Sequence, residues 1–370
     1  MKVALVCPTL GQTQRGYERF MGDLHQVLGD QAQLFKGAGD GDAGATVVRH
    51  LSRTGWLARL FGTRLAYRRY QIEHASFALM LAPHLRCGGF DVVHIIDPPL
   101  AAHLVRLRRW LRLTFKLVFT HGGPAAVQLS PDIDHVHCLT EEAAQQMRAS
   151  GVDAARVSVL PVGIWRERFL PTLSRHALRD QWGLPHDQFV VLCVGAVNRH
   201  HKRIDHLIAE VAAGPSDLLL WLDGSLHPDG DVALLDLARE RLGERFRHTQ
   251  VPSDRVGELF CMADLLVSTA VAESFGMAVV EAMSVGMPVV VHDSPHFSTL
   301  LGDCAHRVDM AQPGALATFL RALRSGHTAL RPAQDPQSAV ARFAWQLLRP
   351  AYIGMYSRLC APVAGRLNPH

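Results

Sequence analysis

Apolar runs alternate with helical segments along the whole chain, and this alternation constrains the fold more than any other feature. The runs cover residues 3–7, 92–96, 116–119 and 136–139 in one series, then 190–194, 218–222, 265–267 and 288–291 in a second. Short apolar runs bounded by polar clusters are typical of buried parallel strands. Because there are two such series, we expect an α/β protein with two Rossmann-like, doubly wound domains facing across a cleft.

The length of 370 residues is enough for two domains, each of which can bury its own core. We place the N-terminal domain at residues 1–170 and the C-terminal domain at residues 186–342. The polar segment 172–188, which contains Pro185, is the predicted linker.

Composition indicates a globular protein, since 48% of the residues are hydrophobic and 19% are charged. The first residues resemble an opening strand more than a signal sequence, and no apolar run reaches the roughly 20 residues of a membrane-spanning helix. The seven cysteines are odd in number and widely spaced. That pattern predicts buried thiols in a reducing compartment, so we expect a cytoplasmic protein.

Basic residues are concentrated in two segments that contain no acid. Residues 53–69 interleave Arg53, Arg59, Arg64 and Arg69 with apolar side chains. This favours contact with an anionic membrane or an anionic acceptor. Residues 106–116 hold four arginines and one lysine, and here we favour an amphipathic helix that is charged on its outer side. No feature indicates a nucleic-acid partner.

Two carboxylates flank a predicted loop-to-helix junction, in the segment from Glu273 to Glu281. We expect Ser274 to cap the helix, which leaves the next N–H groups without intrahelical partners: those of Phe275, Gly276 and Met277. Such donors at the positive end of a helix favour a phosphate group. Glu281 lies one turn deeper on the same face, where it could hold a hydroxyl of the same ligand.

A basic loop follows the predicted strand at residues 190–194. Lys202, with Arg199 and Arg203, would lie at the carboxyl end of that strand, where open α/β sheets bind ligands. These side chains could neutralise a diphosphate and stabilise it as a leaving group. His121 ends another predicted strand and precedes two glycines, which places it at the cleft edge of the first domain.

The segment from Glu273 to Glu281, with Gly286 and Pro288 behind it, resembles the E-x7-E region of retaining, nucleotide-sugar-dependent glycosyltransferases of the GT-B fold, family-four type. The resemblance covers nearly the whole chain and is strongest over residues 190–303. It implies that Glu273 contacts hydroxyls of the donor sugar and that Glu281 contacts the ribose. The backbone amides between them would hold the diphosphate.

The same resemblance implies roles for residues elsewhere. Lys202 matches the family's lysine, but Ala196 occupies the position of its arginine, and either Arg199 or Arg203 would have to compensate. The remaining matches are His121 to an active-site histidine, Gly16 to a loop glycine near the diphosphate, Val251 to the segment facing the base, and Val162 to a position that is usually asparagine.

The resemblance also implies an overall activity. The first domain would bind the acceptor, the second would bind the nucleotide sugar, and a helix within residues 343–370 would cross back to the first domain. A hexosyl group would pass from a nucleoside diphosphate to a hydroxyl of a glycan or lipid-linked acceptor, with retention and as a step of polysaccharide biosynthesis. No metal or other cofactor is expected. The protein would be cytoplasmic, either free or bound peripherally to the inner face of the cell membrane.

Other interpretations stay open at this stage. A GT-B-fold epimerase would act on a sugar nucleotide without an acceptor. A non-catalytic carbohydrate-binding or scaffold subunit is favoured by Ala196 alone. A zinc site would need a third ligand beside His135 and His137, which share one strand face, whereas Cys138 points to the other. The donor base (UDP, GDP or ADP), the sugar and the acceptor are left open.

Overall fold

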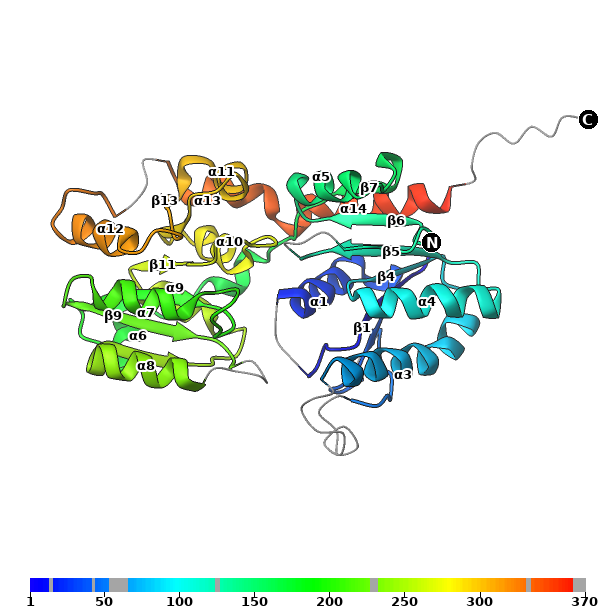
Figure 1. Cartoon of the computed structure of the whole chain (residues 1–370), viewed down its shortest axis with the longest axis horizontal. Coiled ribbons are helices and arrows are strands. Elements are labelled where there is room, and N and C mark those ends of the chain that lie inside the picture. The colour runs from blue at the N-terminus through cyan, green and yellow to red at the C-terminus, as the bar shows by residue number, and fades with distance from the viewer. Residues whose placement is uncertain are drawn as a thin grey trace, which may run out of the picture. The chain divides into compact units, whose positions relative to one another are not determined.

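The computed structural model forms two compact units, each built on a parallel sheet (Figure 1). It describes residues 1–12, 16–41, 44–52, 66–123, 127–226, 232–330 and 334–361. Unit 1 comprises Met1–Gly163 and Trp345–His370, and unit 2 comprises Ile164–Ala344. The chain therefore passes into unit 2 ahead of the predicted linker at 172–188, and that segment contains a helix of unit 2, α6 (Arg175–Gln181).

Unit 1 is built on a seven-stranded parallel sheet with the order β3-β2-β1-β4-β5-β6-β7 in the described part of the chain. Its strands are β1 (Val3–Cys7), β2 (Ala32–Lys36), β3 (Ala45–Val47), β4 (Val92–Ile95), β5 (Lys116–His121), β6 (His135–Cys138) and β7 (Val157–Val159). The four runs predicted in the first half correspond to β1, β4, β5 and β6. The chain adds β2 and β3 on one side of β1 and then returns to add β4 on the other, which is a doubly wound topology.

Helices cover both faces of this sheet. The described helices of unit 1 are α1 (Gly16–Leu28), α3 (Ala66–Cys87), α4 (Pro98–Leu111), α5 (Glu141–Ala149) and α14 (Trp345–Cys360). Apolar residues of α3, α4 and α5 form one core with alternate residues of β1, β4 and β5. The intervening strand residues point to the opposite face, where α14 packs beside α1, and Trp345 stacks on Phe20 with ring centroids 6.3 Å apart.

A buried chain of hydrogen bonds joins α14 to the sheet. Tyr356 Oη lies 2.6 Å from His94 Nδ1, His94 Nε2 lies 2.5 Å from Thr120 Oγ1, and Thr120 Oγ1 lies 2.9 Å from His137 Nδ1. His137 Nε2 is 2.8 Å from the carbonyl oxygen of Leu160, which can only accept. His137 therefore donates through Nε2 and accepts from Thr120, which in turn accepts from His94, while Tyr356 donates to His94.

These histidines predict that unit 1 loses stability in mild acid. Burial lowers the pKa of both His135 and His137 from 6.5 to about 4. A histidine with a lowered pKa in the folded state binds fewer protons there than when unfolded, so the free energy of unfolding falls as the pH drops from 6.5 towards 4. Between pH 7 and pH 5 we expect a loss of roughly 2 kcal/mol for each of the two histidines, measured by urea denaturation.

His135→Gln should reduce this dependence on pH, because it removes one titrating group and leaves the chain through Thr120 intact. His327→Gln is the matched control, since His327 is exposed and lies in unit 2. Equal pH dependence in wild type and His135→Gln would show that burial does not perturb this histidine.

The zinc alternative finds no third ligand among the described residues. His135 Nε2 lies 2.8 Å from Ser158 Oγ, and both ring nitrogens of His137 are engaged as above. No group of three or more His, Cys, Asp or Glu side chains is arranged to hold a metal in the described part of the chain.

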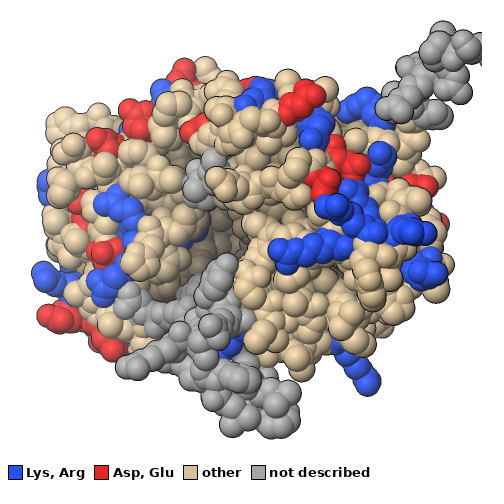
Figure 2. Space-filling model, turned by 45° about the vertical axis from the view of Figure 1, so that its right-hand side comes forward, with Lys and Arg blue, Asp and Glu red and all other residues tan. Residues whose placement is uncertain are grey.

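The segment 106–116 forms the end of α4 and the turn after it. Leu104 and Val105 are buried whereas Arg106 and Arg109 are exposed, which confirms an amphipathic helix with a charged outer side. Arg108 is partly buried and contacts the carboxylate of Asp134. Figure 2 shows Lys and Arg gathered on the right-hand side of the molecule. The arginine-rich segment at 53–69 lies outside the described residues except for its last positions, so its predicted contacts remain a prediction.

All seven cysteines are free, but the expectation that they are buried is wrong for Cys87 and Cys360, which are exposed near the ends of α3 and α14. Within the described ranges, no helix has the length and apolar character needed to cross a membrane.

Unit 2 contains a six-stranded parallel sheet, with the order β10-β9-β8-β11-β12-β13 among the described residues. Its strands are β8 (Phe189–Val194), β9 (Leu218–Asp223), β10 (Phe246–Thr249), β11 (Leu265–Val267), β12 (Val289–His292) and β13 (His306–Val308). Besides α6, its described helices are α7 (Ile204–Ala212), α8 (Val232–Leu242), α9 (Val256–Met262), α10 (Met277–Ser284), α11 (Pro295–Leu301), α12 (Ala315–Arg324) and α13 (Pro336–Val340). The four predicted runs correspond to β8, β9, β11 and β12, so the predicted pair of doubly wound α/β units is confirmed.

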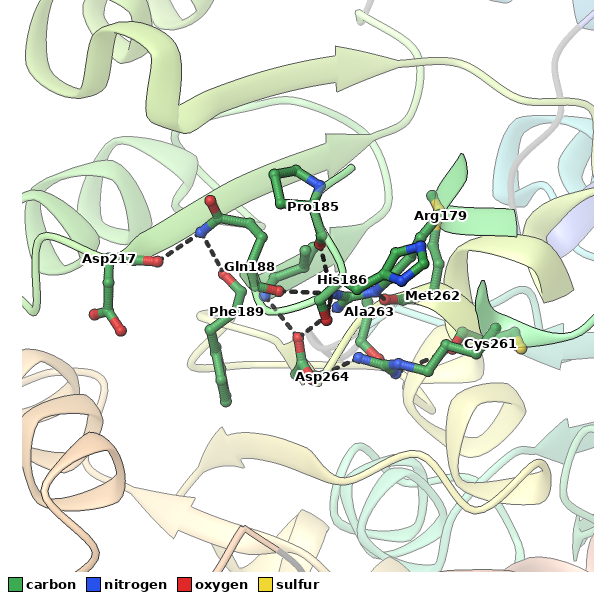
Figure 3. Close-up of polar contacts among 12 residues, drawn as sticks. Arg179, Pro185, His186, Gln188, Phe189, Asp217, Cys261, Met262, Ala263 and Asp264 are labelled. Atoms are coloured by element: carbon green, nitrogen blue, oxygen red, sulfur yellow. Dashed lines mark hydrogen bonds and ion pairs between the residues drawn. The ribbon is translucent and has the colours of Figure 1, made fainter. Parts of the chain in front are cut away.

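Arg179, on α6, anchors the amino-terminal edge of this sheet (Figure 3). Its side chain is 2% exposed, and its guanidinium donates to the Asp264 carboxylate at 2.9 Å. It also donates to four carbonyl oxygens at 2.9–3.0 Å, those of Met262, Pro185, His186 and Gln188. Asp264 accepts the amide of Val190 at 2.8 Å as well, so one arginine joins α6, the end of α9 and the start of β8.

Candidate active site

The order of strands in unit 2 brings two of the predicted site segments together. The chain runs outward from β8 through β9 to β10 and then returns to place β11 on the other side of β8. Ligands bind at such a switch point, outside the carboxyl ends of the strands. The loop that carries Lys202 follows β8, and the loop that carries Glu273 follows β11, so the two residues meet although they are 71 positions apart in sequence.

Glycines allow a tight approach at the start of the Lys202 loop. Gly195 and Gly224 follow β8 and β9 with φ of 148° and 153°, and a Cβ at Gly224 would lie 1.9 Å from the carbonyl oxygen of Gly195. A Cβ at Gly195 would lie 3.2 Å from Lys202 Cε. Only glycine fits at position 224, because backbone on both sides of the contact cannot move away.

Two polar side chains fix the backbone around Lys202. Asn198 Oδ1 accepts from the amides of His201 at 2.8 Å and Lys202 at 2.9 Å. Thr269, just beyond β11, donates to the carbonyl oxygen of Lys202 at 2.7 Å. The sequence reasoning missed Asn198 and Thr269. The signal available for both was a polar residue in the loop that follows a buried strand, β8 for Asn198 and β11 for Thr269.

Lys202 and Glu273 form an ion pair at the carboxyl edge of the sheet, between Nζ and Oε1. The Glu273 side chain is 7% exposed, and its other oxygen lies 3.8 Å from His201 Nε2. Burial acts to raise the pKa of Glu273, but the charge of Lys202 and its hydrogen bond, with a smaller effect from His201, outweigh burial and leave the pKa lowered. Glu273 is therefore held as a carboxylate beside an ammonium group.

The helix after Glu273 begins later than the sequence suggested. Its N-cap is Gly276, with φ of 85°, and not Ser274, so the predicted cap is wrong. A residue with positive φ ends the preceding turn, and glycine accepts that conformation without strain. Met277 is the first helical residue, so the amides in the first turn start there, whereas those of Phe275 and Gly276 precede the helix.

The deeper residues of this segment are buried. Phe275 is 2% exposed and packs edge-on against Phe343, with centroids 5.4 Å apart. Glu281 is 3% exposed and lies four residues after Met277 on α10, one turn from the helix start. The structure thus keeps both carboxylates of the motif near one helix end.

The two arginines proposed to compensate for Ala196 differ in their surroundings. Arg203 takes a left-handed conformation at the N-cap of α7, and its guanidinium donates to the carbonyl oxygen of Met310. Arg199 is half-exposed, and its guanidinium lies 4.0 Å from the carboxylate of Asp205. Arg203 therefore has a structural contact that directs it away from the Lys202 loop.

Val251 also lies at the carboxyl edge of the sheet, just beyond β10. Its amide donates at 2.9 Å to Asp223 Oδ1, which accepts from Thr249 Oγ1 at 2.8 Å too. Burial raises the pKa of Asp223 against the opposing effect of these donors. The amide of Val251 is thus engaged within the protein.

In unit 1, His121 is the last residue of β5. It is 1% exposed, and neither ring nitrogen has a hydrogen-bond partner among the described residues. Burial lowers the pKa of His121, which favours a neutral imidazole. The next residue, Gly122, touches Tyr17, because a Cβ at Gly122 would lie 2.4 Å from that ring. Gly16 begins α1 beside Tyr17, so the structure brings the segments of Gly16 and His121 together. Val162 is buried, at 1% exposure.

Known proteins are similar to this chain in sequence and in fold. Residues 174–317 match the family described as glycosyl transferases group 1. The D-inositol 3-phosphate glycosyltransferase 2 of Catenulispora acidiphila is 30% identical over 241 residues, which are 59% of this chain and 54% of that protein. The D-inositol 3-phosphate glycosyltransferase of Xylanimonas cellulosilytica is 30% identical over 231 residues, 59% of this chain and 55% of that protein. The chain thus spans about half the length of the curated relatives it matches.

Solved structures extend the likeness to both units. Sucrose-phosphate synthase from Thermosynechococcus elongatus superposes with a TM-score of 0.80 at 20% identity, over 97% of this chain and 99% of that one. HepE from Anabaena, in complex with UDP-glucose, gives 0.77 at 17% identity, over 97% and 100%. At such identities the likeness shows the fold. Residues 174–317 are thus similar to the group 1 glycosyl transferases, and the two units have the GT-B fold.

Proposed function

We propose that this protein is a retaining glycosyltransferase that moves a sugar from a nucleoside diphosphate to a hydroxyl group of an acceptor. The observation that carries the proposal is the Lys202–Glu273 ion pair, at the carboxyl edge of the unit 2 sheet and beside the start of α10. An ammonium group and helix amides bind a diphosphate, and a carboxylate binds sugar hydroxyls, so this edge offers partners for both parts of the donor.

Each residue has a proposed role in the reaction. Lys202 stabilises the charge on the departing diphosphate, and Arg199, which is half-exposed, assists it in place of the arginine missing at Ala196. Glu273 orients the donor sugar, and Glu281 holds the ribose. The amides at the start of α10, from Met277 on, hold the diphosphate, with the backbone of Ser274, Phe275 and Gly276 lining the approach.

The anomeric configuration is retained because the acceptor hydroxyl attacks the same face of the donor sugar from which the diphosphate leaves. The bond from the anomeric carbon to the phosphate oxygen breaks, the bond to the acceptor oxygen forms, and the acceptor proton passes to the departing phosphate oxygen. His121, neutral and buried at the end of β5, positions the donor sugar from unit 1, and Gly16 allows backbone to approach the diphosphate. We propose no metal in this reaction, because Lys202 and the helix end supply the positive charge.

The acceptor is proposed to be a glycan or a lipid-linked glycan. The curated relatives are named for D-inositol 3-phosphate, so a phosphorylated polyol is a further acceptor to test. Contact between an anionic membrane and the segment 53–69 belongs to the same proposal, and it rests on the arginines of that segment alone.

The experiment that tests the donor site is thermal stabilisation by UDP, GDP and ADP, in wild type and in Lys202→Ala. A nucleotide at about a hundred times its dissociation constant adds roughly 2.7 kcal/mol to the free energy of unfolding. We expect UDP to stabilise the wild type, because HepE, which shares the fold, was solved with UDP-glucose. Lys202→Ala should lose most of this effect.

A failure of all three nucleotides to stabilise the wild type would refute the donor site and favour a non-catalytic subunit. Product analysis then separates transfer from epimerisation. An epimerase would convert the donor without acceptor, whereas the proposed enzyme needs the acceptor to form a new glycosidic bond.

A further inference from the structure

Exposed apolar side chains gather on two helices of unit 1. Trp110, on α4, is 77% exposed, and on α3 Leu79, Met80 and Ile72 are 62%, 49% and 45% exposed. Aliphatic and aromatic residues of this size are more often buried, and a contiguous apolar patch on a surface marks a site of interaction.

These side chains belong to one outer surface. On α4, Arg106, Arg109 and Trp110 are exposed at helical spacing, and on α3 the exposed positions 72, 79, 80, 83, 84, 86 and 87 lie on one side of the helix. The opposite sides of both helices pack into a single core on one face of the sheet. Because α3 and α4 also pack against each other, their exposed sides form one surface, here named the α3–α4 surface.

This surface carries positive charge and no exposed acid. Arg86 on α3, Arg106 and Arg109 on α4, and Arg112 at its C-cap are all exposed. Glu73 is the only acid of α3 and is fully buried, and residues 98–116 contain none. Arg109 lies 3.6 Å from Asp132, which is part of the loop beside α4, whereas Arg86, Arg106 and Arg112 form no ion pair with the described residues.

We propose that the α3–α4 surface docks on an anionic lipid bilayer. Arginines attract the negative surface of such a membrane, and an exposed tryptophan with aliphatic neighbours enters the interface between head groups and acyl chains. A polyanion such as a nucleic acid would account for the arginines but would leave the aliphatic stripe of α3 without a partner. The combination of both kinds of side chain on one surface of two helices favours the bilayer.

The surface belongs to unit 1 and shares no residue with the donor site of unit 2, so the proposal does not depend on the proposed reaction. It also differs from the segment 53–69, because the exposed residues that carry it lie at position 72 and beyond. If both proposals hold, the membrane is where a lipid-linked acceptor would meet the enzyme.

Co-sedimentation of the full chain with vesicles tests the proposal. We expect the wild type to bind vesicles of phosphatidylglycerol and phosphatidylcholine, and to bind pure phosphatidylcholine far more weakly. Each arginine near an anionic surface contributes about a fivefold change in partition, so Arg106→Gln, Arg109→Gln and Arg112→Gln together should weaken binding about a hundredfold. Trp110→Ser should weaken it roughly tenfold, since an apolar side chain no longer leaves water.

The matched control changes three exposed arginines of unit 2, Arg166, Arg239 and Arg241, to glutamine, which lowers the net charge by the same amount. It should bind vesicles like the wild type, and thermal melts should show that every variant is folded. If the triple α4 variant binds vesicles as well as the wild type does, the proposal is overturned. It is also overturned if binding is lost only in a variant in which the charges of Arg59 and Arg64 are reversed. The proposal is also overturned if Trp110→Ser binds vesicles like the wild type and salt abolishes the binding completely. That result would favour a general binding site for polyanions.

Discussion

Replacing Lys202 with alanine is expected to lower the rate of sugar transfer by a factor of about 10² to 10³. The ammonium group is the nearest positive charge to Glu273 and to the proposed diphosphate, and removing one group that stabilises developing charge has an effect of this size. The measurement is kcat/KM with the nucleotide sugar that stabilises the wild type. Glu273→Ala should abolish measurable transfer, because the donor sugar loses the carboxylate that orients it.

A second variant separates the loss of activity in Lys202→Ala from a loss of folding stability. Lys202→Ala leaves the Glu273 carboxylate buried without its lysine, which costs about 3 kcal/mol of unfolding free energy. The double variant Lys202→Ala with Glu273→Gln removes the charge as well, so it should recover most of that stability and none of the activity. Recovery of activity in the double variant, or wild-type turnover in Lys202→Ala, would refute the catalytic role. His327→Ala serves as the control, because His327 is exposed and its hydrogen bond is to Ser325.

Replacing Arg179 with methionine is expected to destabilise unit 2 by about 3–5 kcal/mol. The substitution leaves the partly buried Asp264 carboxylate, 18% exposed, without this partner and leaves four carbonyl oxygens without their donor. Lysine cannot replace it, because an ammonium group lacks the planar fork that reaches these acceptors together. Chemical denaturation measures the loss, and faster hydrogen exchange in β8 should accompany it, because Asp264 also holds the amide of Val190.

Arg175→Gln is the matched comparison for Arg179→Met. Arg175 contacts the same carboxylate at 2.6 Å, but its side chain is 38% exposed, so solvent can replace the contact. We expect it to cost less than 1 kcal/mol. If the two variants lose the same free energy of unfolding, the number of acceptors around Arg179 does not decide how much this residue stabilises unit 2.

The strands that the sequence predicted are those in the centre of each sheet. The predicted runs became β1, β4, β5 and β6 in unit 1 and β8, β9, β11 and β12 in unit 2. A central strand in a parallel sheet is buried on both faces, so its sequence is continuously apolar and easy to identify. The missed strands include both edges of each sheet, such as β10 with the sequence Phe-Arg-His-Thr and β13 with His-Arg-Val. Edge strands have one side open to solvent and tolerate polar residues.

The sequence predicted which residues belong to the candidate site, but it did not predict how their side chains are arranged. Lys202 and Glu273 were identified separately, and nothing in the local sequence of either indicated that they form an ion pair. Their contact depends on the strand order, which places β11 next to β8. Ser274 was wrongly expected to cap α10, because serine is a common cap, whereas the positive φ of Gly276 decides where the helix begins.

By itself, the sequence determined the α/β class, the two series of strands and the chemical groups available at the strand ends. These follow from local patterns, in which burial sets the spacing of apolar residues and turns require glycine and polar residues. Only the tertiary structure decided which groups meet. It joined Lys202 to Glu273, buried Arg179 among five acceptors in a segment predicted to be a linker, and packed α4, which carries Trp110, against α3. Such contacts link residues far apart in the chain, and they depend on strand order and helix packing, which no local pattern encodes.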